Sequence, residues 1–303
     1  MRAQRSRCAP GCRRAGRGVP PPVNPVDRAP TPVRVVLCTT EGIIGASVLR
    51  SLVSSPDIAV TGVILSSRVL SARYGWSRGA WQQIRTSGLH YALYLWCATG
   101  LSDLIGRCGP AGAVSSIASA QRIPILTTRD LNAQPGRDFI AARAPEVLLS
   151  AFFNQRIAPE TYAIAPNGGI NIHPSLLPEF RGVDPVFYSR LRGTARFGVS
   201  VHRIDADLDT GEILAQSEHV PGPTDSVLRT TLDLYVSGTH LVTERLRAFL
   251  RAERGRSQQD SGSYDSWPSA ADVAALHETG GCLVRWQDLM ASLTGRPGQP
   301  ATG

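Results

Sequence analysis

The sequence predicts an α/β fold built on a doubly wound, mostly parallel sheet, and three observations support this. Residues 33–65 read as strand, loop, helix and strand in that order, an opening typical of parallel sheets with crossover helices. Further short β-prone runs follow, and several end in polar residues. The chain has 303 residues, 42% of them hydrophobic, which is enough for one large domain or two small ones with a packed core.

The first elements follow from the spacing of apolar residues. Residues 33–38 form an apolar run typical of a buried strand, and residues 43–54 repeat apolar side chains at helical spacing. Residues 58–65 form the second expected strand. Residues 68–87 are rich in Arg, Gly and Trp and are expected to be irregular.

The later elements are predicted on the same grounds. The sequence predicts a helix over residues 89–105, a strand over 123–127, a short helix near 138–143 and a strand over 146–153. It then predicts strands over residues 169–173 and 198–203, an edge or antiparallel strand over 212–218 and a long helix over 227–251. Residues 253–263 are polar and are expected to be a linker, and the last 40 residues are only weakly patterned.

The positive charge is concentrated at one end of the chain. The net charge is +8, but residues 1–30 contain seven arginines and one acid, Asp27, which leaves only +2 for the rest. A body this close to neutral is a poor electrostatic match for a nucleic-acid backbone. The chain contains no lysine, so a Schiff-base lysine mechanism is excluded.

The first residues are expected to form a disordered tail rich in Arg and Pro over residues 1–32, because they cannot bury enough apolar surface to become ordered. They contain no apolar run long enough for a secretory signal. The longest apolar stretch, residues 89–101, is too short to cross a bilayer, so no membrane partner is expected. The expected location is the cytoplasm, with scattered reduced thiols. The six cysteines are Cys8, Cys12, Cys38, Cys97, Cys108 and Cys282.

No metal is expected. Cys8 and Cys12 have the spacing of half a metal site, but no second pair lies nearby. The acidic triplet Asp205, Asp207 and Asp209 resembles a calcium loop, yet Thr210 stands where that loop needs glycine. This triplet could also be a solvated turn.

The most informative residues lie near the middle of the chain. Asn171 and His173 are two apart on a predicted strand, so they share a face, and Pro174 ends the strand. Polar residues also follow two other strands, at Asn154-Gln155 and at residues 205–209. Because ligand sites in open parallel sheets form beyond the carboxyl ends of the strands, we expect these groups to share one crevice.

This set of side chains suits transfer of an acyl or formyl group to an amine. Asn171 can donate to the carbonyl oxygen without titrating. His173 can donate when protonated or accept a proton near neutral pH, and Asp209 can orient the imidazole or support proton removal. Asn171 and His173 could instead be a hydrogen-bonded structural pair. His202 is expected to face away from this crevice. The remaining histidines, treated as structural, are His90, His219, His240 and His277.

Residues 145–216 resemble the catalytic core of the 10-formyltetrahydrofolate-dependent formyltransferase family. The run Asn171-Ile172-His173-Pro174-Ser175-Leu176-Leu177-Pro178 matches the signature of that family, Arg181-Gly182 and Pro185 continue it, and Leu208-Asp209-Thr210-Gly211 matches its aspartate segment. The resemblance implies a formyltransferase-like, Rossmann-type fold with a short C-terminal extension. It also implies Asn171, His173 and Asp209 as catalytic residues.

The resemblance further implies where the folate and the acceptor bind. The implied folate-binding residues are Phe152, Phe153, Asn154, Gln155, Ile157, Asp205 and Asp207. The implied substrate loop consists of Ser175, Leu177, Pro178, Arg181 and Gly182. The expected catalytic domain covers residues 33–222, and residues 223–303 form a long helix with a small extension. Residues 66–88 and 260–303 are expected to shape the acceptor pocket.

The expected function is transfer of a formyl group from 10-formyltetrahydrofolate to a primary amine of a small metabolite, such as an amino sugar or amino acid. A tRNA acceptor stays open as the less favoured reading, because acidic residues outnumber arginines over residues 225–303. Hydrolysis of the folate donor and non-catalytic binding also stay open. Arg68, Arg73, Arg78 and Arg85 are either phosphate ligands or solvated. The sequence gives no oligomeric state.

Overall fold

The computed structural model describes residues 31–68, 75–99, 113–251, 255–258, 262–288 and 290. The expected tail over residues 1–32 therefore lies almost wholly outside the described residues, as do Arg73 and the expected helical residues 100–105. The described residues from Pro32 onward belong to one unit.

The core of this unit is a seven-stranded sheet with the order β3-β2-β1-β4-β5-β7-β8. The strands are β1 (Val33–Thr40), β2 (Ile58–Ser66), β3 (Ile125–Thr128), β4 (Val147–Ala151), β5 (Gly169–His173), β7 (Phe197–Arg203) and β8 (Ile213–His219). Strands β1 to β5 run parallel to one another, while β7 is antiparallel to β5 and β8 to β7. The predicted doubly wound, mostly parallel α/β sheet is thus confirmed. A second, two-stranded sheet joins β6 (Arg181–Gly182) to β9 (Tyr264–Asp265).

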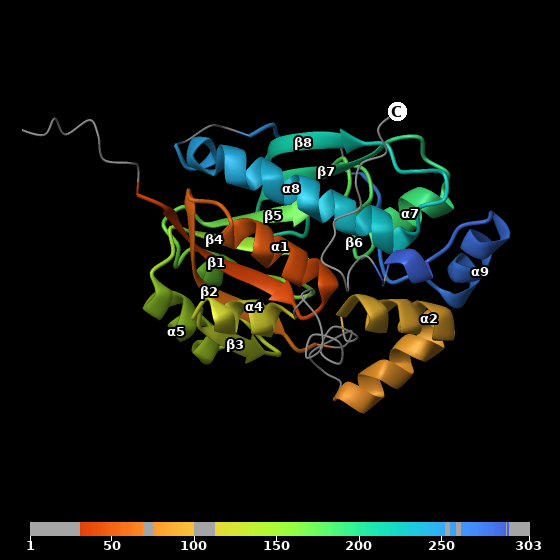
Figure 1. Ribbon diagram of the computed structural model, residues 1–303, viewed down its shortest axis with the longest axis horizontal. Helices are drawn as coiled ribbons and strands as arrows, with labels where there is room; N and C mark the ends of the chain where they lie inside the picture. Colours follow the sequence, from red (N-terminus) through yellow and green to blue (C-terminus); the bar gives the residue numbers. More distant parts are fainter. Residues whose placement is uncertain are drawn as a thin grey trace, which may run out of the picture. The chain divides into compact units, whose positions relative to one another are not determined.

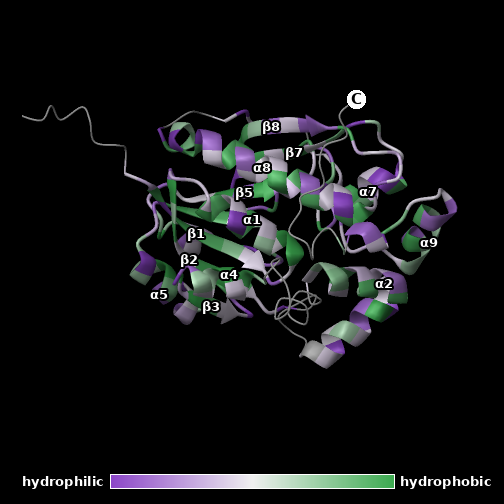
Figure 2. Cartoon of the chain, in the orientation of Figure 1, coloured by the Kyte–Doolittle hydropathy of each residue, from purple (hydrophilic) through white to green (hydrophobic). Residues whose placement is uncertain are grey.

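Helices cover both faces of the large sheet. They are α1 (Ile43–Val53), α2 (Trp76–Thr99), α4 (Val114–Ala120), α5 (Gln134–Arg143), α6 (Pro159–Tyr162), α7 (Pro185–Leu191), α8 (Val227–Leu250) and α9 (Ala270–Glu278). Alternate residues of β1 enter opposite cores, Val35 and Leu37 one and Val36 and Cys38 the other. Helices α1 and α8 cover the first face and α5 belongs to the second (Figure 1). The inner strands are hydrophobic, whereas the outer sides of the helices are mixed (Figure 2).

The expectation of an irregular segment over residues 68–87 is wrong for its second half. Helix α2 begins at Trp76 and runs to Thr99, with a kink at Gly88, where φ is 80° and ψ is 167°. The buried side chains of this helix include Tyr91 and Tyr94, which lie three residues apart after the kink. Polar and small residues around this kink hide the apolar repeat from a reading of the sequence. The short helix α4 is not expected from the sequence either, since its seven residues include only two buried side chains.

The long helix α8 and the chain after it are part of the same core. Ser226 caps α8 by accepting from the Arg229 N–H, and its hydroxyl donates to Asp288 at 2.6 Å. The weakly patterned last 40 residues contain α9, which begins with a capping box between Ser269 and Asp272. The polar capping residues and short length of α9 explain why periodicity alone does not reveal it.

Gly238 lets α8 lie directly on the sheet. A Cβ atom at this position would stand 2.5 Å from Cγ2 of Ile172 and 2.7 Å from Cγ2 of Val199. Both neighbours are core residues of adjacent strands, so they have little room to move. The glycine in this helix is therefore explained by packing, despite the low helix propensity of Gly.

We predict that Gly238→Ala lowers the free energy of unfolding although alanine is the better helix former. Overpacking typically costs about 1–3 kcal/mol, against a propensity gain of about 1 kcal/mol. The measurement is urea unfolding of the wild type, Gly238→Ala and the exposed control His240→Ala on the same helix. Equal or greater stability of Gly238→Ala would show that α8 does not approach the sheet this closely.

Candidate functional site

Strand β5 presents Asn171 and His173 on one face, opposite the core formed with α8. Ile170 and Ile172, the alternating residues of this strand, lie in the core beneath α8. His173 is only 4% exposed, while Asn171 is partly exposed. Strand alternation therefore places the amide and the imidazole side by side, as the sequence predicts.

A single carboxylate joins these two side chains. Asp209 Oδ1 lies 3.4 Å from Asn171 Nδ2 and 3.5 Å from His173 Nδ1. The other oxygen, Oδ2, accepts a hydrogen bond from the Gly182 N–H at 3.1 Å. Asp209 has a φ of 57°, a left-handed conformation that non-glycine residues rarely adopt. The structure thus brings the three expected catalytic side chains together around Asp209.

The path of the chain that positions Asp209 beside His173 differs from the expectation. Strand β7 is antiparallel to β5, so Arg203 pairs with Ile170 and the carboxyl end of β7 lies at the amino end of β5. The Ile204 N–H then donates to Gly169 O at 2.8 Å. The loop after β7 folds back over the sheet face to bring Asp209 to His173. The assumption that all three strands end at the same edge is therefore wrong for β7, because local sequence does not encode strand direction.

The hydrogen bonds of His173 identify which of its two ring nitrogens carries the proton. Nε2 lies 3.0 Å from Phe180 O, and since a carbonyl only accepts, Nε2 carries the proton. Nδ1 is therefore the nitrogen that can gain or lose a proton, and it faces Asp209. Burial lowers the pKa of His173 below its ordinary value, and the Asp209 charge only partly opposes this.

Asp209 is held in its ionised form. Burial alone would raise the pKa of this carboxyl, but the neighbouring His173 and His202 rings and the Gly182 N–H hold it well below its usual range. At neutral pH the site therefore contains a carboxylate next to a neutral imidazole with an open Nδ1. This is the arrangement of a base whose conjugate acid is stabilised by an adjacent negative charge.

His202 does not face away from this site, contrary to the expectation from sequence. It is paired with Asn171 across β7 and β5, and side chains of directly paired residues share a face. Its Nε2 accepts from Asn171 Nδ2 at 3.1 Å, and its Nδ1 donates to Arg203 O at 2.8 Å. His202 Nε2 also lies 3.7 Å from Asp209 Oδ1. The sequence could reveal this only if the antiparallel register of β7 were known.

A cavity of about 620 Å³ opens beside these residues, a size within the range of small-molecule sites. All seven residues implied for folate binding border it, and so do the three catalytic candidates. The seven are Phe152, Phe153, Asn154, Gln155, Ile157, Asp205 and Asp207. Asp205 and Asp207 are exposed, so they stand at its mouth.

The polar side chains after β4 hold the neighbouring loops. Gln155 accepts from the Leu131 N–H at 2.9 Å and donates to Ser66 Oγ and Thr128 O at 2.7 and 3.0 Å. Asn154 accepts from the Ser66 hydroxyl at 2.5 Å and donates to Arg68 O. Because these amides bond to protein partners, residues 152–157 offer a ligand mainly backbone atoms and apolar side chains, together with the exposed side chain of Arg156.

Most residues of the expected substrate loop support the site from behind the cavity wall and do not border the cavity. Of its five residues, Gly182 alone borders the cavity within the described part of the chain. Ser175 and Leu177 are buried, and their polar groups bond to Glu179 O and Ser200 Oγ. Arg181 is buried and bonds to Gln258, and the Leu177–Pro178 peptide bond is cis. This turn shapes the wall around His173 and delivers the N–H that binds Asp209.

Parts of both regions expected to shape an acceptor pocket border the cavity. From residues 66–88 these are Arg68, Ala80, Gln83 and Ile84, and from the C-terminal region they are Tyr264 and Trp267. Helix α2 adds residues that sequence reasoning missed, namely Leu89, Tyr91, Ala92, Leu93, Tyr94, Leu95, Trp96 and Thr99. Arg68 pairs with Asp130 at 3.5 Å and also with Arg129 O, so it is partly neutralised as a phosphate ligand.

A buried hydrogen bond connects α2 to the substrate loop. Tyr91 donates to Asp184 Oδ2 at 2.8 Å, and Asp184 Oδ1 accepts from the Phe187 N–H at 3.1 Å as the N-cap of α7. Burial raises the pKa of Asp184 to about 6, although both hydrogen bonds lower it. Asp184 lies two residues after Gly182, so this contact helps fix the loop that binds Asp209.

Within the described residues, no group of three or more His, Cys, Asp or Glu side chains is arranged to hold a metal ion. The cysteines that the structure describes, Cys38, Cys97 and Cys282, are free thiols. None of the described helices is both long and apolar enough to cross a membrane.

The sequence of this chain is similar to those of known proteins. Residues 106–232 match the formyl transferase family. A methionyl-tRNA formyltransferase from Roseiflexus sp. (strain RS-1) is 37% identical over 158 residues, which cover 51% of this chain and 48% of that protein. The chain therefore spans about half the length of the curated relatives it matches.

Two solved structures share the fold. One is a phosphoribosylglycinamide formyltransferase from Bacillus halodurans, with a TM-score of 0.51 and 16% identity over 72% of this chain and 96% of that chain. The other is a sugar N-formyltransferase from Shewanella sp FDAARGOS_354, with a TM-score of 0.50 and 15% identity over 77% and 76% of the two chains. At these identities the similarity concerns the fold alone.

We predict that Tyr91→Phe destabilises the protein more at pH 8 than at pH 5. The folded state raises the pKa of Asp184 to about 6, so its ionisation costs stability as the pH rises through that value. The Tyr91 hydroxyl favours the ionised carboxyl, and its loss should cost about 1–3 kcal/mol where the group is charged. Urea unfolding at both pH values measures this, with Tyr162→Phe on α6 as the control. An equal loss at both pH values would contradict the assignment.

Proposed function

Because the chain belongs to the 10-formyltetrahydrofolate-dependent formyltransferase family, we propose that it transfers a formyl group from 10-formyltetrahydrofolate to a primary amine of a small metabolite, such as an amino sugar or amino acid. The observation that supports this most directly is the meeting of Asn171, His173 and Asp209 beside one cavity. These groups supply a neutral donor, a base and a carboxylate at one point.

The reaction needs two kinds of help. The amine nitrogen attacks the formyl carbon, a carbon–nitrogen bond forms, and the carbonyl electrons move to oxygen. The nitrogen becomes positively charged and must lose a proton. The bond from the formyl carbon to the folate nitrogen then breaks, and that nitrogen receives a proton. Catalysis therefore requires a donor at the oxygen and a group that accepts and returns a proton.

His173 is the proposed proton acceptor. Its Nε2 proton is held by Phe180 O, which leaves Nδ1 to receive the proton of the amine. Asp209 would stabilise the imidazolium that results. From the sequence alone, His173 could either donate to the formyl oxygen or accept a proton, with Asp209 supporting proton removal. The tautomer and the lowered pKa of His173 favour the role of proton acceptor.

Asn171 is the proposed donor to the formyl oxygen. One of its N–H groups binds His202 at 3.1 Å, while its contact with Asp209 at 3.4 Å is long for a hydrogen bond. The more weakly held N–H can turn to an oxygen that gains charge. His202 would then fix the orientation of the amide through the first N–H.

The cavity wall fits the folate donor. Phe153 and Ile157 offer apolar side chains, and Phe152, with a φ of 52°, turns the backbone where strand β4 ends. Backbone groups of residues 152–157 would hold the pterin, and residues 205–209 would form the opposite wall. The donor supplies the activated formyl group, and these residues bind and orient it.

The acceptor is proposed to be small because α2, Tyr264 and Trp267 border the same cavity as the catalytic groups. The names of the curated relatives favour methionyl-tRNA as the second candidate acceptor. Hydrolysis of the donor and binding without turnover are two further candidate functions, and one experiment separates all four.

The test is incubation of the purified protein with 10-formyltetrahydrofolate and a panel of amino sugars, amino acids and methionyl-tRNA, read by mass spectrometry. Formylated product is expected from the wild type, and His173→Ala should reduce the rate by about a hundred- to ten-thousand-fold. The exposed histidine variant His240→Ala is the control. Formate released without any acceptor would identify a hydrolase, and donor binding with neither product would identify a binding protein.

A pH profile tests the role of His173. If the neutral imidazole is the base, kcat/KM for the donor stays constant near neutral pH and falls with acidification only below pH 6.5, because burial lowers the pKa of His173. Asp209→Asn removes the charge that raises this pKa and should move the acid limb to lower pH. Activity that instead falls as the pH rises through 6.5 would show that the protonated ring is required.

A further inference from the structure

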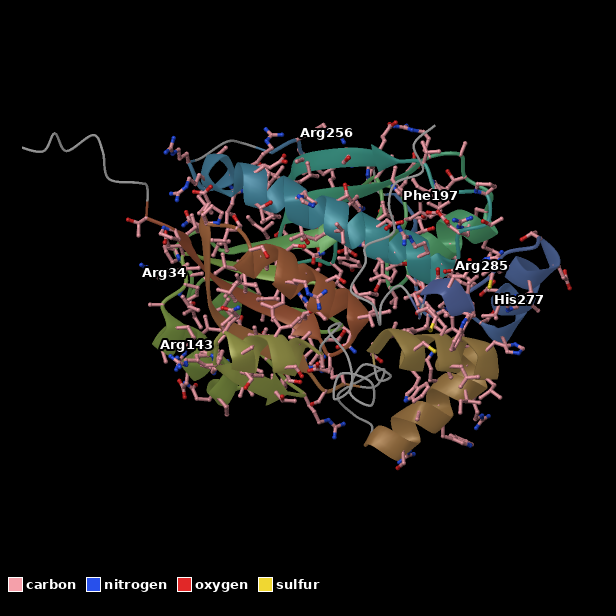
Figure 3. All side chains as sticks on the ribbon, viewed as in Figure 1. Arg34, Arg143, Phe197, Arg256, His277 and Arg285 are labelled. Atoms are coloured by element: carbon pink, nitrogen blue, oxygen red, sulfur yellow. The ribbon has the colours of Figure 1, made fainter. Side chains whose placement is uncertain are left out.

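The segment after α8 is not a free linker. The Gly255 N–H donates to Glu212 Oε2 at 3.2 Å, and Arg256 and Ile213 exchange two backbone hydrogen bonds of 2.9 and 2.8 Å. Arg256 lies beside β8 (Figure 3), and its guanidinium donates to Gln216 Oε1 at 2.7 Å. The described residues 255–258 are therefore fixed against the start of β8, directly after the loop that contains Asp209.

Gln258 extends from this segment to the catalytic loop. Its Nε2 donates to Asp209 O at 3.1 Å and to Gly211 O at 2.7 Å. Its Oε1 accepts two hydrogen bonds from Arg181, at 3.2 Å from Nε and 2.6 Å from a terminal nitrogen. Both N–H groups and both lone pairs of the amide are thus occupied, which fixes its orientation.

These four contacts join the two backbones that hold the Asp209 carboxylate. On one side they clamp the loop at Asp209 itself and at Gly211. On the other they hold Arg181, whose neighbour Gly182 donates its N–H to Asp209 Oδ2 at 3.1 Å. Asp209 needs such support because a non-glycine residue at a φ of 57° persists only where its surroundings impose it.

We propose that Gln258 is a positioning residue for formyl transfer, which keeps the Asp209 carboxylate aligned with His173 Nδ1 and Asn171 Nδ2. The effect of Gln258 on catalysis rests on the proposed function, whereas its effect on the position of Asp209 does not. Without the amide clamp the Asp209 loop can relax, and the carboxylate then moves relative to the imidazole. Gln258 lies 49 residues from Asp209 in sequence, so the segment after α8 acts on the catalytic centre from outside the signature motifs.

Two substitutions distinguish the contacts of Gln258 with Arg181 from its contacts with Asp209 and Gly211. Gln258→Leu removes all four hydrogen bonds. Gln258→Glu keeps an acceptor for Arg181 but replaces the donor that binds Asp209 and Gly211. The matched control is Asn167→Ala, which removes an amide donor to Glu146 O at 2.9 Å, at the amino ends of β4 and β5.

Both Gln258 variants should lower kcat by about ten- to a hundredfold with KM for donor and acceptor little changed, because misalignment affects the reacting geometry more than binding. Asn167→Ala should leave kcat at the wild-type value. A reduced kcat in Gln258→Leu but not in Gln258→Glu would assign the effect to the contact with Arg181. It would overturn the proposed role of Gln258 at the Asp209 loop. A kcat within about twofold of wild type for both variants, alongside a strongly reduced kcat for Asp209→Asn, would overturn the inference and leave the proposed function intact.

A second readout does not require activity. The ring signal of His173, identified in histidine-labelled protein by its loss in His173→Gln, reports the position of Asp209 in the free protein. It should shift in both Gln258 variants and stay unchanged in Asn167→Ala. If the wild type transfers no formyl group, the proposed function fails. The His173 signal then tests whether Gln258 positions Asp209, and a signal that does not shift in the Gln258 variants overturns that inference. If Gln258→Leu does not fold, Gln258→Glu gives both readouts.

Discussion

The site depends on one buried, ionised carboxylate. Burying the charge of Asp209 is unfavourable unless donors surround it. The Gly182 N–H and the Asn171 amide donate to it, and the rings of His173 and His202 lie 3.5 and 3.7 Å from its Oδ1. These groups come from β6, β5 and β7, so one anion fixes three separate segments relative to one another. The same condition makes the arrangement vulnerable, because the loss of any one donor raises the cost of keeping the charge where the chemistry needs it.

Much of the fold and part of this site can be predicted from local sequence. The alternation Asn171-Ile172-His173 places two polar side chains on one face and an apolar one in the core, and the structure agrees. The strands of the parallel half also follow from their apolar runs, since buried parallel strands need no neighbour to be recognised. Asp209 is identified by a motif resemblance rather than by its pattern, because a left-handed loop residue leaves no periodic signal.

What could not be predicted depends on contacts that are distant in sequence. The prediction for His202 is wrong about its face because nothing in residues 197–203 reveals that β7 runs antiparallel to β5. Gln258 reads as part of a polar linker, yet it bonds to backbone 47 to 49 residues away. The first half of helix α2 escapes prediction because its kink at Gly88 breaks the apolar repeat. In each case tertiary pairing, rather than local propensity, decides the outcome.

The charge state of the site constrains the order of events in the proposed reaction. With Asp209 ionised and His173 neutral, the pocket carries a negative charge before the amine arrives, which favours entry of the amine in its ammonium form. An ammonium cannot attack carbon, so the amine must lose one proton to solvent before attack, and His173 Nδ1 beside Asp209 is placed to take the second proton as the carbon–nitrogen bond forms. The imidazolium and the carboxylate then form a neutral pair in a poorly solvated cavity, where their attraction is strongest. Binding of the acceptor and its activation are therefore coupled through the same carboxylate. The proposed reaction thus depends on the position of Asp209 as well as on its charge.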